Sequence, residues 1–283
     1  SQNYDSNIWG GSSVSTSDDL DAMNLNPAGF GVDRGKQMGI NFQQSNILDV
    51  DNSNLHIYSL INRFSCGFAV QHEYDEVRKY NWTVAYGLKL FDNIYSGFRT
   101  NKSKDYSIGL LYRPKSYLSS GFTLFTNKDD SFRDIRYGLS LRPLYFVKNK
   151  NSDKDTFLNY SNLTIGYDKL VNYNMDWKES SFDEYFFINF DIVQGANISL
   201  RKGSGSSYAV NLSLNLGNNG FSINNYPSSN PDESSLSSNG FGYFIYSQKQ
   251  ETKANFLSPR MNNYVYLELE GNFIEEKPKK KFF

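Results

Sequence analysis

Between residues 38 and 248 the chain alternates between apolar and polar positions with a period of two. Because successive side chains of a β-strand point to opposite faces, this pattern predicts strands with one apolar side. In the segment 80–90 the apolar side comprises Trp82, Val84, Tyr86, Leu88 and Leu90. The opposite sides carry small or polar residues, mostly Gly, Ser, Asn and Thr.

About fourteen such segments follow one another, and many have 8 to 11 residues. A tilted membrane strand requires roughly 9–11 residues, whereas strands of soluble proteins more often have about 5–6. The predicted strands are 38–43, 54–62, 65–74, 80–90, 93–101, 104–113, 117–126, 132–142, 159–168, 184–193, 196–202, 207–216, 220–226 and 239–248. Since the connections leave no room for crossover helices, the fold class is all-β: a closed antiparallel up-and-down transmembrane β-barrel, with twelve to sixteen strands and fourteen favoured.

The connections alternate in length. They are mostly tight after even-numbered segments, and several are longer and polar after odd-numbered ones, namely 44–53, 75–79, 169–183 and 227–238. Because outer-membrane barrels have short periplasmic turns and longer external loops, both ends of the barrel are predicted to lie in the periplasm. The connection 143–158 breaks this rule, so it contains either an unrecognised strand pair or an extended periplasmic connection.

Composition excludes several other classes of protein and of binding site. Aromatic residues make up 16% of the 283 residues, which argues against disorder, and no run approaches the ~20 apolar residues of a membrane-spanning helix. Acids and bases balance at a net charge of -1, so no nucleic-acid partner is expected. The single Cys66 excludes a disulfide framework, and His56 and His72 lie too far apart in sequence to indicate a metal site.

No catalytic motif is present, neither a nucleophile elbow nor a phosphate-binding loop, so neither enzyme activity nor a cofactor is expected. The polar start of the chain fits an exported protein after removal of its signal peptide.

Residues 1–36 break the alternation. Ser17 followed by Asp18, Asp19 and Asp21 predicts a short helix with a capped, acid-rich first turn, and the Pro27 region predicts a turn that ends it. This segment is either a surface arm or a plug inside the barrel. The three acids are expected to cap this helix; in a plug they could instead meet bases of the lumen. Bases are expected inside the barrel because Arg or Lys facing lipid at the midplane costs ~2–4 kcal/mol. The predicted luminal bases are Lys89, Arg99 and Arg136.

The sequence Asn26-Pro27-Ala28-Gly29-Phe30, just before the first predicted strand, resembles the hallmark motif of FadL-like outer-membrane barrels. That group includes the long-chain fatty-acid channel and the PorV-type barrels of secretion systems. The resemblance implies that the N-terminal stretch forms a hatch in a fourteen-stranded barrel. This chain is shorter than typical members, so reduced loops and lateral openings are expected.

The C-terminal end differs again. After a polar linker at 250–263, the stretch 264–276 is similar to the opening strand of signal peptide peptidase A (SppA) domains. That resemblance implies a barrel joined to a protease domain whose catalytic Ser and Lys would lie beyond Phe283. Alternatively, the end is the last barrel strand, although the basic run 277–281 argues against a lipid-facing strand, or it is a solvated tail.

Three regions are therefore predicted: a plug or hatch at 1–36, a transmembrane barrel at 37–249, and a periplasmic linker with the start of an extension at 250–283. The favoured function is an outer-membrane barrel of a diderm bacterium, embedded in lipid, that anchors or partners a periplasmic or secretion-related protein. The lumen faces lack a continuous apolar lining, which favours this function over the first alternative, a FadL-like channel for small hydrophobic molecules. The second alternative is a soluble secreted β-protein, such as an adhesin or a carbohydrate-binding domain.

Overall fold

The computed structural model describes most of the chain. The described residues are 12–46, 49–72, 79–126, 133–146, 163–173, 179–193, 196–203, 208–216, 219–226, 238–248 and 255–257. They contain fourteen strands and three short 3-10 helices. The strands are β1 (Gly35–Asn46), β2 (Asp49–Ile61), β3 (Phe64–His72), β4 (Lys79–Phe91), β5 (Ile94–Asn101), β6 (Tyr106–Lys115), β7 (Leu118–Thr126), β8 (Arg133–Leu141), β9 (Leu163–Tyr173), β10 (Glu179–Val193), β11 (Ala196–Gly203), β12 (Tyr208–Leu216), β13 (Asn219–Tyr226) and β14 (Ser238–Gln248). The helices are η1 (Leu20–Met23), η2 (Pro27–Val32) and η3 (Pro143–Phe146).

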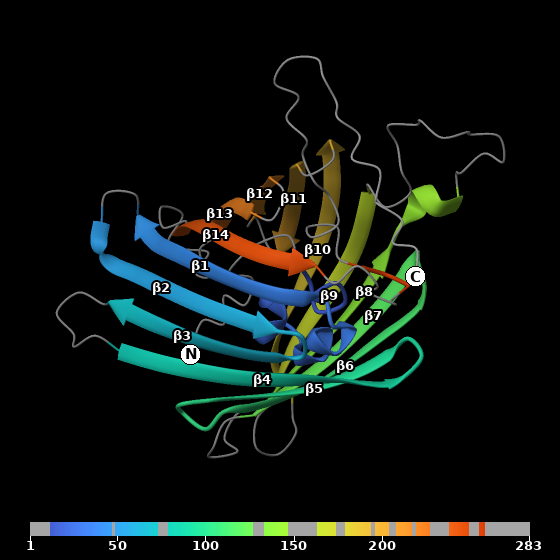
Figure 1. The fold of residues 1–283 in the computed structure, drawn as a ribbon, viewed down its shortest axis with the longest axis horizontal. Coiled ribbons are helices and arrows are strands. Elements are labelled where there is room, and N and C mark those ends of the chain that lie inside the picture. The colour runs from blue at the N-terminus through green and yellow to red at the C-terminus, as the bar shows by residue number, and fades with distance from the viewer. Residues whose placement is uncertain are drawn as a thin grey trace, which may run out of the picture.

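The strands form one closed barrel (Figure 1). Each strand pairs antiparallel with its neighbours in sequence, and β1 pairs with β14 from Gly35–Gln248 to Gln44–Asn239. The predicted fold class and the favoured strand number are therefore confirmed. β8 pairs directly with β9, so the two are neighbours in the barrel order. Of the connection 143–158 the structure describes η3, while 147–158, where a strand pair or an extended connection was predicted, lie outside the described residues.

Two predicted loops are much shorter in the structure. β1 and β2 extend into the predicted loop 44–53, and β9 and β10 extend into the predicted loop 169–183. In the added ends of β1, β2 and β10 polar residues occupy both faces, and in that of β9 the adjacent Leu170 and Val171 place apolar residues on both, so the alternation disappears although the backbone ladder continues. Ladder hydrogen bonds do not depend on side-chain polarity, which explains why the sequence pattern missed these extensions.

The two faces of the barrel differ as the alternation predicts. On β6, Ile108, Leu110 and Tyr112 point outward and are about half exposed, whereas Ser107 and Gly109 point inward and are buried. The same outward row of large apolar side chains runs around the barrel, for example Trp82 on β4 and Leu139 on β8. A closed barrel leaves no unpaired edge, and this outer face matches the apolar band of a membrane barrel. No helix among the described residues is long and apolar enough to cross a membrane.

Residues 12–34, here called the luminal segment, lie inside the ring of strands and not on its outer surface (Figure 1). Helix η2 packs on the inner faces of β4, β5 and β6, and all residues of the segment except Asn24 and Asp33 are buried. Asp19, one of the three acids expected to cap a helix, caps η1. The simple turn predicted around Pro27 is wrong, because Asn26 caps η2 with Pro27 at its first position. A proline suits that position because it needs no donor there.

Candidate functional site

The inner wall beneath the luminal segment is lined by glycines. They are Gly87, Gly97, Gly109, Gly121 and Gly138, one on each strand from β4 to β8, and we call this row the glycine seat. Gly97 is the cross-strand partner of both Gly87 and Gly109. A Cβ atom on Gly97 would lie 2.2 Å from the carbonyl carbon of Pro27, and one on Gly109 would lie 2.0 Å from Asn26 Oδ1. The wall therefore lacks side chains where the backbone of the luminal segment touches it.

Asn26, the first residue of the predicted hatch motif, connects the luminal segment to the barrel wall. Its Nδ2 donates to the backbone oxygen of Leu110 on β6 (2.9 Å) and to that of Val14 (3.0 Å). Its Oδ1 accepts from the backbone N–H of Ala28 (3.1 Å), which caps η2. Only a carboxamide supplies donors and an acceptor on one short side chain, so aspartate could not replace both functions.

Gly29 allows η2 to pack closely on η1 and on the stretch before it, because a Cβ there would lie 2.9 Å from Ala22 Cβ and 2.2 Å from the Ser17 carbonyl oxygen. Phe30 then enters an apolar cluster between the segment and the wall. Its members are Leu20, Ala22, Met23, Phe30, Tyr58, Leu60, Ala85 and Phe244. The lumen was expected to lack a continuous apolar lining; at this place the inward side chains of β2, β4 and β14 nevertheless include apolar ones.

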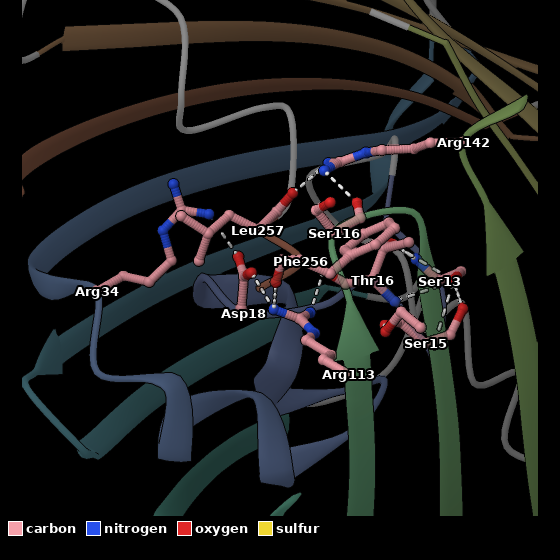
Figure 2. A network of polar contacts seen from close by, with 11 residues as sticks. Ser13, Ser15, Thr16, Asp18, Arg34, Arg113, Ser116, Arg142, Phe256 and Leu257 are labelled. Carbon is pink, nitrogen blue, oxygen red and sulfur yellow. Dashed lines mark hydrogen bonds and ion pairs between the residues drawn. The ribbon is translucent and has the colours of Figure 1, made fainter. Parts of the chain in front are cut away.

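An ionic centre lies next to the seat, at the barrel end where the tight turns at 62–63, 92–93 and 116–117 connect strands. Asp18 Oδ1 lies 2.8 Å from Arg34 Nη1, and Asp18 Oδ2 lies 2.6 Å from Arg113 Nη1 (Figure 2). The side chains of Asp18 and Arg113 are fully buried. Arg113 also donates to the backbone oxygens of Thr16 (3.0 Å) and Phe256 (2.6 Å), so one wall residue joins both terminal segments.

Residues 255–257, here called the return segment, follow the last strand and fold back onto this centre. Phe256 is fully buried, with its ring centre 3.9 Å from the guanidinium of Arg142 and 5.5 Å from that of Arg113. Arg142 also donates to the Leu257 oxygen, and Asn255 Nδ2 donates to the Pro114 oxygen (2.8 Å). This part of the predicted linker is thus packed against the barrel, while the stretches 264–276 and 277–281 lie outside the described residues.

Further hydrogen bonds hold the start of the luminal segment. Ser119 on β7 donates to the Ser15 oxygen (2.6 Å), and the N–H of Val14 donates to Asp168 Oδ2 on β9 (3.3 Å). Asp168 is itself paired with Arg201 of β11 (2.9 Å). The luminal segment is therefore bonded to β6, β7 and β9.

The predicted site residues lie as follows. Asn26, Pro27, Ala28, Gly29 and Phe30 are buried together on the seat. Asp18 meets Arg34 and Arg113, Asp19 caps η1, and Asp21 lies in the first turn of η1. Arg99 and Arg136 point inward, and Arg136 stacks over Phe125 (4.5 Å). Lys89 instead pairs with Asp92 beside a tight turn (2.7 Å), away from the luminal segment's acids.

Sequence reasoning missed Arg34, Arg113 and Arg142. A signal for two of them was present, because an Arg-Pro pair stands near the end of β6 (Arg113-Pro114) and directly after β8 (Arg142-Pro143). Both arginines are buried at the tight-turn end of the barrel. Each of the two contacts the return segment.

A closed barrel of fourteen antiparallel strands, with an apolar outer face and a polar, partly filled lumen, defines a transmembrane β-barrel of the outer membrane. No protein-family model matches the chain, and no curated protein matches its sequence.

Solved structures similar in fold are outer-membrane barrels. Omp33 of Acinetobacter baumannii is 6% identical with a TM-score of 0.49, over 77% of this chain and 100% of that one. The CymD monoaromatic hydrocarbon channel is 9% identical with a TM-score of 0.46, over 87% and 97%. A FadL homologue of Pseudomonas aeruginosa is 9% identical with a TM-score of 0.41, over 85% and 96%. The class rests on the barrel's own geometry and not on these likenesses.

Proposed function

We propose that this protein is a plugged outer-membrane barrel: the luminal segment acts as a hatch, and the barrel anchors or partners a periplasmic or secretion-related protein. The observation that supports a hatch is the close fit between the luminal segment and the barrel wall. The backbone of the segment packs against the glycine seat, and a buried ion pair joins Asp18 to Arg113. A chain end that merely rested in the lumen would need neither feature.

The proposed partner side is the tight-turn end. Both the ionic centre and the return segment lie there, and short turns of outer-membrane barrels face the periplasm. A periplasmic protein bound or joined at this end would therefore approach the hatch directly.

A second candidate function is a channel for small hydrophobic molecules. It is favoured by the apolar cluster around Phe30, because movement of the luminal segment would uncover Tyr58, Leu60 and Phe244 on the wall. Those side chains would then offer an apolar surface inside an otherwise polar lumen.

Conductance in planar lipid bilayers tests the hatch. We expect a chain lacking residues 12–33 to conduct more than the intact chain, and the double variant D18N/R113Q to open more often than wild type. Phe146→Ala is the matched control, because this exposed residue of η3 lies outside the luminal segment. Unchanged conductance in both hatch variants would overturn the plug.

The two functions separate by what accompanies the intact barrel when it is purified from native membranes after mild cross-linking. A protein cross-linked at the tight-turn end supports the anchoring function, whereas an extractable hydrophobic molecule supports the channel. Recovery of neither from membranes that contain the intact barrel would contradict both.

A further inference from the structure

We propose that the return segment is a latch: it holds the luminal segment closed, and its displacement releases that segment. This inference rests on the proposed function, because it concerns how the same hatch is controlled. A periplasmic protein joined to the chain beyond Leu257, or bound to the return segment, would operate the hatch by pulling residues 255–257 out of the barrel mouth.

The first coupling runs through Arg113. Its Nη1 donates both to the Phe256 oxygen and to Asp18 Oδ2, each at 2.6 Å, and its Nη2 donates to the Thr16 oxygen. When the return segment leaves, this fully buried guanidinium loses one acceptor and the cover of the Phe256 ring. Water then reaches the Asp18–Arg113 pair, and the higher local dielectric weakens the attraction that holds the luminal segment.

The second coupling is apolar and independent of charge. Leu257 packs against a cluster that contains Ala28 and Val32 of η2 together with Tyr95 and Leu111 of the wall. The return segment therefore presses the hatch motif onto β5 and β6. Its removal would uncover one side of η2.

The return segment can leave without opening the barrel. Residues 255–257 belong to no strand, and their described hydrogen bonds are with the side chains of Arg113 and Arg142 and with the carbonyls of Arg113 and Pro114 near the end of β6. Arg142, directly after β8, stacks on Phe256 and donates to the Leu257 oxygen and to the Ser116 oxygen, so it ties the return segment to the wall. Such peripheral contacts open more readily than the strand ladders.

The test uses the full chain in lipid vesicles and compares the double variant F256A/L257A with Phe146→Ala. Phe146 is an aromatic residue at the same end but is 67% exposed, so it controls for loss of an aromatic side chain. Amide hydrogen exchange of residues 12–34 is measured together with single-channel opening. We expect exchange in the luminal segment to rise at least tenfold and openings to become more frequent in the double variant, with neither change in the control.

If exchange rises only in the return segment and the luminal segment stays as protected as in wild type, the latch is overturned. Suppose instead that the luminal segment exchanges faster in F256A/L257A, but that conductance is unchanged both in this variant and in D18N/R113Q. The latch is then supported, and the proposal that the luminal segment plugs the barrel is contradicted. Arg142→Gln provides a second route should F256A/L257A not fold: it weakens the hold on Phe256 and Leu257 but retains Arg113, and it should also raise exchange in the luminal segment. Unchanged exchange in that variant would overturn the latch as well.

Discussion

At the residue scale, Asp18 determines how the luminal segment is held. Its carboxylate is fully buried between two guanidinium groups, one from Arg34 within the segment and one from Arg113 on the wall. Removing one partner of a buried ion pair leaves an uncompensated charge in a region that water reaches poorly. The loss destabilises the folded arrangement by about 3–5 kcal/mol. The exposed pair of Lys89 and Asp92 has the same chemistry without the burial.

We therefore predict that Asp18→Asn lowers the free energy of opening of the luminal segment by about 3–5 kcal/mol. Hydrogen exchange of residues 12–34 in detergent-solubilised protein measures that quantity. Asp92→Asn is the matched control and should leave the same exchange rates unchanged, because its partner Lys89 is solvated. Equal effects of the two substitutions would contradict a role for burial.

The sequence indicated Asp18 as one of three acids, but it could not say which base each would meet. Arg113 lies 95 positions away from Asp18 and reaches it only because the barrel closes. Lys89 was an equally plausible base by alternation, yet it lies near a turn where Asp92 is three residues away. Long-range ion pairs depend on strand register and on depth in the lumen, neither of which the spacing of apolar residues specifies.

At the element scale, the glycine seat shows how strands and helices fit. Five adjacent strands each lack an inward side chain where η2 or the stretch before η1 passes. From the sequence alone, these glycines are simply small residues on the polar faces of the predicted strands. Only the strand register shows that they are aligned, because it makes Gly97 the direct partner of Gly87 and of Gly109.

We predict that Gly97→Ala displaces η2, because the added Cβ would lie 2.2 Å from the backbone of Pro27, which cannot rotate away. Overpacking of this kind costs typically ~1–3 kcal/mol. Hydrogen exchange in residues 26–32 should rise while the strands stay protected. Ser96→Ala, its neighbour on the outer face of β5, should have no such effect; a similar rise in both variants would refute the seat.

The outer faces of the strands give a second prediction at this scale. Leu110 lies in the middle of β6 and is 46% exposed to the surroundings, whereas Phe91 ends β4 beside a tight turn. In a membrane barrel, Leu110→Arg should lower the free energy of unfolding from lipid vesicles by about 2–4 kcal/mol, and Phe91→Arg by about 0–1 kcal/mol. Urea titrations in vesicles measure both, and equal effects would contradict a depth-dependent lipid contact.

The alternation predicts all fourteen strands in the right order, but several of the observed strands extend beyond their predicted ends. The pattern predicts loops at the polar ends of β1, β2 and β10, because alternation marks only the part of a strand that faces lipid on one side. The 3-10 helices carry no periodic signal, so η2 was predicted as a turn although Asn26 and Pro27 mark its start. Apolar luminal residues such as Leu60 were missed because Ile61 beside it is apolar as well.

For the molecule as a whole, closure of the barrel and filling of its lumen depend on different sets of contacts. The ladder between β1 and β14 runs along nearly the full length of both strands and involves no residue of the luminal segment. The luminal segment, in turn, is bonded to the wall through side chains on β6, β7 and β9. Backbone ladders should therefore maintain the barrel without the segment, while the segment adds stability to a barrel already closed.

This separation predicts the behaviour of the chain that lacks residues 12–33 on a gel. Because strand pairing alone closes the barrel, the unboiled variant should still migrate differently from the boiled one, as a folded barrel does. Loss of the buried ion pair and of the apolar cluster should lower the temperature at which this difference disappears, relative to wild type and to Phe146→Ala. Absence of any difference at all temperatures would mean that the luminal segment is required to form the barrel; an unchanged transition temperature would mean that its contacts contribute no stability.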